Sequence, residues 1–317
     1  NENLIIKAKE SLIDTIGVSM GACKDFEINN IYNNLLACHE NGPSTVWGKP
    51  VKTSLFIAAL INGMMGHVLE LDDVHKRSKC HAGTVVIPTA LVAGEFSGSS
   101  GNEVLEAIIL GYETMVRVGM GFGVSSHRLK GWHVTSTAGT FGAAATASKL
   151  LGLKYEQVLS ALGIAGTQSS GLWAFTADGA TSKKFHPGHA ASCGIMAAVL
   201  AKSGMIGPSR ILDADDGGLF PAMSDSYDYS IIEKDLGVTF EFTDIDRKPY
   251  ACCRSIHPPI NAVLNIKNRE NLNIDDIDHI NVKTYKIAII QCGHTVEPKN
   301  IFEARFSMAY GMAVALI

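Results

Sequence analysis

The stretch Asn62–His75 reads NGMMGHVLELDDVH, and after four more residues come Cys80–Gly83 (CHAG) and the apolar run Thr84–Val92. It places three carboxylates and three imidazoles in a segment that is otherwise hydrophobic. Ionisable groups without partners are costly to place near a core, so such a cluster is typical of a chemical site. The apolar residues on either side predict helices near residues 51–68 and 82–96.

Helical spacing of apolar residues continues through the first two thirds of the chain. It is clear in Leu4–Val18 and in Asn102–Val118, which follows the turn Gly98–Gly101. Further helices are expected near residues 137–151, 155–170, 188–203 and 208–213. Together these segments predict a helical domain over residues 1–243.

Glycine and alanine are frequent in segments 137–150 and 188–203. Each glycine lowers helix propensity, but small residues let two helices approach closely. We therefore expect tightly packed, mostly buried helices in the first domain.

The pattern changes after about residue 237. Residues 238–242 and 280–285 alternate as strands do, residues 259–267 read as a helix, and a last helix is expected over 302–317. This order predicts a smaller α+β domain over residues 244–317 in a protein that is mainly α. Two strands are fewer than an independent sheet needs, so we expect this domain to be incomplete at its C-terminal end.

Composition limits the classes of protein and of partner. At 317 residues the chain exceeds the usual size of one core, and 46% hydrophobic against 18% charged residues is typical of a globular protein. The net charge of -4 favours a small molecule over nucleic acid as the partner. Apolar runs are interrupted by Pro88 or Gly194 well short of the ~20 residues of a membrane span. The seven cysteines have no regular spacing, which favours a reducing compartment and a cytoplasmic location.

No motif for a cofactor is present. Gly119–Gly123 lacks the third glycine and the preceding strand of a dinucleotide site, and neither a P-loop nor iron–sulfur cysteine spacing occurs. A metal set of His67, His75, Cys80 and His81 lacks the regular pairings of zinc sites. We therefore predict acid–base catalysis without a cofactor or metal.

Several residues outside the opening stretch have types suited to an anionic substrate. Lys183 directly precedes a Gly/Ala-rich helix, where burial would make it a base or a focused positive charge for a carboxylate. His133 precedes the start of another helix, where it could donate a proton to an anion. Lys248 and Arg254 could clamp carboxylates. The alternatives are an acidic turn with surface histidines at residues 70–81 and a packed His133.

Five segments in the same order resemble the MmgE/PrpD family. They are Asn62–Gly83, Lys130–Ala144 (KGWHVTSTAGTFGAA), Asp178–Ala191 (DGATSKKFHPGHAA), Lys248–Pro258 (KPYACCRSIHP) and Ala304–Tyr310 (ARFSMAY). The family contains 2-methylcitrate dehydratases, cis-aconitate decarboxylases and iminodisuccinate epimerases, and its members are longer homodimers.

The resemblance also implies roles for single residues. His81, His133, Lys183 and Tyr310 match catalytic positions, and Glu70 matches an acidic residue that helps to form the site. We expect the substrate to be bound by Glu70, Asp73, Lys248, Arg254 and His257. The decarboxylases have a histidine where this chain has Cys253, with His257 four residues later, and this departure favours the epimerase-like or uncharacterised members.

The expected function is therefore proton transfer on a small di- or tricarboxylate by a homodimeric enzyme. We rank a lyase, either a dehydratase or a decarboxylase, first and an epimerase second. A dimeric binding module without catalysis is the alternative from another class.

Overall fold

The computed structural model describes residues 2–38 and 41–317, and the chain divides into two compact units. Unit 1 holds residues up to Trp173 and Ser182–Arg247, and unit 2 holds Ala174–Thr181 and Lys248–Ile317. The predicted boundary was 243/244. Helices account for nearly all of the regular structure, so the predicted mainly α class is confirmed.

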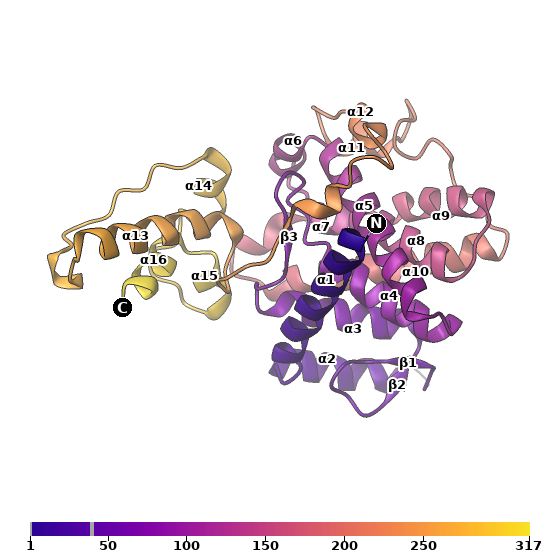
Figure 1. The fold of residues 1–317 in the computed structure, drawn as a ribbon, viewed down its shortest axis with the longest axis horizontal. Coiled ribbons are helices and arrows are strands. Elements are labelled where there is room, and N and C mark those ends of the chain that lie inside the picture. Colours follow the sequence, from indigo (N-terminus) through magenta and orange to yellow (C-terminus); the bar gives the residue numbers. More distant parts are fainter. Residues whose placement is uncertain (1, 39–40) are drawn as a thin grey trace. The chain divides into compact units, whose positions relative to one another are not determined.

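Unit 1 is built from helices joined by short loops (Figure 1). Its α-helices are α1 (Glu2–Ala22), α2 (Phe26–Ala37), α3 (Leu55–Val68), α4 (Gly83–Ser97), α5 (Gly101–Gly121), α6 (Val124–Leu129), α7 (Val134–Thr137), α8 (Gly139–Leu150), α9 (Tyr155–Thr167), α10 (Phe185–Lys202), α11 (Leu219–Met223) and α12 (Ser230–Glu233). Its 3-10 turns include η2 (Thr181–Lys184) and η3 (Glu241–Asp244). The two-residue strands β1 (Ser44–Thr45) and β2 (Lys52–Thr53) pair, as do β3 (Val74–His75) and β4 (Ile245–Asp246).

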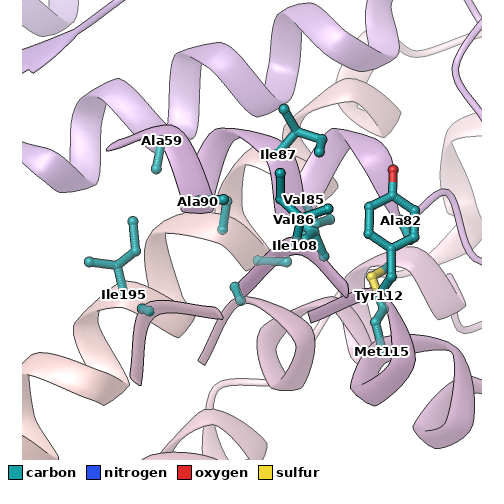
Figure 2. Close-up of a cluster of buried hydrophobic side chains, with 14 of the residues drawn as sticks. Ala59, Ala82, Val85, Val86, Ile87, Ala90, Ile108, Tyr112, Met115 and Ile195 are labelled. Atoms are coloured by element: carbon teal, nitrogen blue, oxygen red, sulfur yellow. The ribbon is translucent and has the colours of Figure 1, made fainter. Parts of the chain in front are cut away.

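The core lies among α3, α4, α5, α8 and α10, which pack against one another. Figure 2 shows part of it, where Val86 of α4 lies near Ile108 of α5. A strongly apolar segment such as α4 is buried on most sides, as expected for a helix that is hydrophobic all round.

Glycine sets the spacing between α3 and α10. A methyl group placed on Gly63 would lie 2.7 Å from the Cα atom of Gly188, and one on Gly188 would lie 2.1 Å from the carbonyl oxygen of Leu60. Small residues likewise set the spacing between α8 and α10, since a methyl group on Gly194 would clash with Ala143. The expectation of tightly packed helices is thus met inside unit 1. The predicted dimer therefore rests on the family resemblance alone.

Unit 2 contains α13 (His257–Glu270), α14 (Lys286–Cys292), α15 (Ile301–Arg305) and α16 (Met308–Leu316), with η4 (Arg254–Ile256) and η5 (Ile274–Asp276). Another 3-10 turn, η1 (Trp173–Thr176), joins the units. The ring of Phe175 lies 5.9 Å from that of Phe302, which attaches segment 174–181 to this unit.

Four expected elements take other forms. Residues 238–242 are not a strand, because the Glu113 carboxylate accepts the backbone N–H groups of Glu241 and Phe242. Residues 280–285 form no strand, since a strand needs a paired neighbour and none of the described residues supplies one. Residues 208–213 form turns, and the helix expected over 302–317 is divided at Ser307, whose hydroxyl caps α16 by accepting from the Tyr310 N–H.

Among the described residues, no helix combines the length and the apolar character that crossing a bilayer requires. All seven cysteines fall within the described part of the chain and are free thiols.

Asp73 fastens the loop between α3 and α4. Its Oδ1 accepts the Gly83 N–H at 2.9 Å and its Oδ2 accepts the Tyr112 hydroxyl at 2.7 Å, so the loop is tied to the start of α4 and to α5. Burial raises the pKa of Asp73 to about 7.

Replacing Gly188 by alanine should destabilise the protein by about 1–3 kcal/mol, because the new methyl meets a backbone carbonyl that cannot move away cheaply. Gly17→Ala is the matched control. Gly17 is an exposed position in α1 with no atom within 4 Å of the added methyl, so this change should stabilise by about 0.5–1 kcal/mol. Urea unfolding measures both, and equal effects would refute the close approach of α3 and α10.

The free energy of unfolding should depend on Asp73 between about pH 4 and 7. The folded protein keeps a proton on this carboxyl that the unfolded chain releases near the ordinary aspartate pKa of 3.8. Stability from this group is therefore fully present below that pH and is lost as pH rises toward 7, by at most about 1.4 kcal/mol per pH unit. Asp73→Asn should lack this slope in urea titrations at pH 5, 6 and 7, and an identical slope in both proteins would contradict it.

Candidate active site

The end of α3 brings the first two functional side chains into place. His67 lies in the last turn of α3, and Glu70 follows the helix with a left-handed φ of 51°. Helices commonly use glycine at this position because other residues pay a steric cost there. A glutamate held in this conformation indicates that its side chain is needed.

Lys183 is the cation of the site. It belongs to η2, directly before α10, and only 2% of it is exposed. Its Nζ donates to Glu70 in an ion pair and lies 2.8 Å from the Nε2 atom of His67. A buried lysine is costly unless its hydrogen-bonding capacity is used, and these two partners supply that compensation.

His67 and His81 share one carboxylate. Asp72 Oδ2 lies 2.7 Å from His67 Nδ1 and 3.1 Å from His81 Nδ1. His81 Nδ1 is also 2.8 Å from the carbonyl oxygen of Asp73, and the backbone N–H of His81 donates to the hydroxyl of Thr135 in α7. The two rings lie 5.0 Å apart.

His133 completes the group around His67. Its ring lies 5.9 Å from that of His67, 5.2 Å from that of Trp173, and its Nδ1 is 2.9 Å from the Nδ1 of His186. Burial, followed by the nearby charges of His186 and Lys183, lowers the pKa of His133 well below its usual value. Burial likewise lowers the pKa of His186 to about 4, so both rings are neutral near pH 7.

The structure therefore brings together His81, His133, Lys183 and Glu70, which come from three separate parts of the sequence. Glu70 is the ion-pair partner of Lys183, and its contact with the substrate stays a prediction. Both carboxylate oxygens of Asp73 accept hydrogen bonds within the protein, and its contact with the substrate stays a prediction. Sequence reasoning gave no role to His186 or to the pairing of His67 with Asp72. The crowding of His67, Glu70 and Asp72 within six residues was the available signal.

Of the residues weighed as metal ligands, His67 and His81 come together, with Asp72 as the third member of a group whose ligand atoms lie within 4.8 Å of one another. His75 instead contacts the hydroxyl of Ser78, and burial raises the pKa of the Cys80 thiol to about 12. The Lys183 cation beside His67 opposes the binding of a second cation here.

The other predicted residues belong to unit 2. Lys248 and His257 are buried, Arg254 lies in η4, and Tyr310 is 44% exposed on α16. His257 Nε2 contacts the carbonyl oxygen of Cys252, and burial lowers the pKa of His257 to about 4. Participation of these four residues in the site stays a prediction.

Known proteins resemble the chain along most of its length. The sequence model of the MmgE/PrpD N-terminal domain matches residues 1–232, and that of the MmgE/PrpD C-terminal domain matches residues 250–317.

Three curated relatives carry related names. Cis-aconitate decarboxylase of Aspergillus terreus is 29% identical, over 87% of this chain and 60% of the relative. Cis-aconitate decarboxylase of Homo sapiens is 28% identical, over 100% of this chain and 66% of the relative. The cis-aconitate decarboxylase-like protein oryM of Aspergillus oryzae is 31% identical, over 70% of this chain and 49% of the relative. The chain thus spans about half to two thirds of the length of these relatives. Because the two domain models together match nearly all of it, the chain belongs to the MmgE/PrpD family.

Proposed function

We propose that this protein is a lyase that acts on a small tricarboxylate of the cis-aconitate type by acid–base catalysis. The observation that carries the proposal is the buried group in which Lys183 contacts His67 and Glu70, with His81 and His133 beside the same imidazole. The names of the relatives supply the substrate class, since three of them are called cis-aconitate decarboxylases or decarboxylase-like.

The chemistry needs groups that exchange protons at carbon. Dehydration begins with loss of a proton next to a carboxylate, and decarboxylation ends with delivery of a proton to the carbon that has lost carbon dioxide. We assign proton exchange to His81 and His133, whose imidazoles can do this near neutral pH. Lys183 stabilises negative charge that develops on the substrate, as a cation does best when water is excluded.

His133 acts as a neutral ring. Its pKa is lowered by burial, so the ring is neutral near pH 7 and is a poor source of an imidazolium proton. This refines the expectation that His133 is the proton donor.

The test is proton NMR of the purified protein with cis-aconitate in deuterium oxide. The proposal expects consumption of cis-aconitate and deuterium in the product. Exchange of substrate protons without a change of skeleton, seen with succinate-like acids, would favour the epimerase instead. No exchange with any citrate-, aconitate- or succinate-like acid would favour the binding module.

Lys183→Ala should lower turnover by roughly a hundredfold or more, since groups of this kind typically contribute that much. Lys184→Ala is the control, because Lys184 is the neighbouring lysine and forms its ion pair with Glu27, not with Glu70. Lys183→Gln is a second variant that can still donate a hydrogen bond to Glu70. It separates the loss of the lysine charge from a loss of activity caused by leaving the buried Glu70 carboxylate without a partner. Circular dichroism checks folding, and equal losses for Lys183 and Lys184 would show that the assignment is wrong.

A further inference from the structure

We propose that Asp72 is a positioning residue that fixes both His67 and His81 with hydrogen on Nδ1, so that Nε2 is the proton-accepting atom of each ring. The inference deepens the proposed function and rests on it only for its kinetic part. It assigns separate tasks to two histidines that lie next to each other.

One carboxylate oxygen contacts both rings. Asp72 Oδ2 is 2.7 Å from His67 Nδ1 and 3.1 Å from His81 Nδ1, and only 1% of Asp72 is exposed. An ionised carboxylate can only accept hydrogen bonds, so it favours an N–H at both Nδ1 positions. A single oxygen can accept from two donors because it has more than one lone pair.

A second contact, independent of Asp72, gives the same answer for His81. The carbonyl oxygen of Asp73 lies 2.8 Å from His81 Nδ1. A carbonyl cannot donate, so the Nδ1 atom must carry the hydrogen. The lone pair of the neutral His81 ring is then on Nε2.

A second contact also decides the state of His67. Lys183 Nζ lies 2.8 Å from His67 Nε2, and a lysine ammonium donates without accepting. His67 Nε2 must therefore hold the lone pair, which again leaves the hydrogen on Nδ1, facing Asp72. Which nitrogen of a histidine is protonated is set by the bond that the other one makes, and here both bonds agree.

His67 and His81 consequently have different roles. His67 uses its lone pair to orient Lys183, so it acts on the reaction through Lys183. In His81 the proton-accepting atom is Nε2, while Asp72 and the Asp73 carbonyl hold the ring through Nδ1. Asp72 thereby links the orientation of the cation to that of the acid–base histidine.

The three residues could also hold a metal ion, because their ligand atoms lie within 4.8 Å of one another. Binding in that mode would remove the hydrogen from both Nδ1 atoms and place a dication close to Lys183. The state of the Nδ1 atoms therefore separates the two assignments.

The decisive measurement is long-range proton–nitrogen NMR of protein labelled with ¹⁵N in its histidine rings. Spectra of His67→Gln and His81→Gln identify the two residues. We expect hydrogen on Nδ1 and a lone pair on Nε2 in both rings, unchanged by an equimolar amount of zinc chloride. Hydrogen on Nε2 in either ring, or loss of both Nδ1 hydrogens on addition of zinc, would overturn the proposal. This readout does not require activity, so it stands even where cis-aconitate is not turned over.

Kinetics test the positioning role. Asp72→Asn retains an oxygen that can accept a hydrogen bond from Nδ1, whereas Asp72→Leu does not. We therefore expect kcat with cis-aconitate to fall about tenfold in the Asn variant and about a hundredfold or more in the Leu variant. KM should be nearly unchanged in both. Asp213→Asn, at an exposed pair with Arg210, serves as the control and should match the unmodified protein. Equal losses in the Asn and Leu variants, or a change confined to KM, would reject Asp72 as the positioning residue.

Discussion

The burial of Lys183 against Glu70 and His67 is the constraint on which the site depends. Removing an ammonium and a carboxylate from water costs several kcal/mol per ion, so the pair persists only if its geometry is held by the surrounding fold. The close approach of α3 and α10 at Gly63 and Gly188 provides that geometry. His67 lies one turn after Gly63, and Lys183 lies just before the helix that carries Gly188, so a bulkier residue at this crossing would separate the ions.

A second layer of contacts holds the loop that carries Asp72 and His81. Asp73 is tied to α4 and α5, and β3 pairs with β4. The segment that leads to β4 is held in turn by Arg117, which donates to four backbone carbonyls between residues 231 and 239 and pairs with Glu113. Glu113 also accepts hydrogen bonds from the backbone N–H groups of Glu241 and Phe242. The buried Arg117–Glu113 pair on α5 therefore supports β4, the strand that pairs with β3 in the loop next to the site.

These contacts show why the sequence predicts some features and not others. Periodicity locates α1 because this helix has one buried face, which is a local property. The strand expected at 238–242 fails because the Glu113 carboxylate, 128 positions before Glu241, captures N–H groups of this segment, which no local pattern reveals. Motifs gave His81, His133 and Lys183 as candidates. The role of His67 depends on a contact with Lys183 across 116 positions, so it emerges only when the helices are packed.

The charge state of the histidines bears on catalysis against simple binding. A site that only holds a polycarboxylate gains most from groups that stay positive near pH 7, such as arginine or an imidazolium. Here burial keeps His133 and His186 neutral, which weakens them as anion receptors. Neutral imidazoles beside a lysine are instead suited to accept and return protons while the lysine carries the positive charge. The electrostatics of unit 1 therefore favour the proposed acid–base role over a binding module.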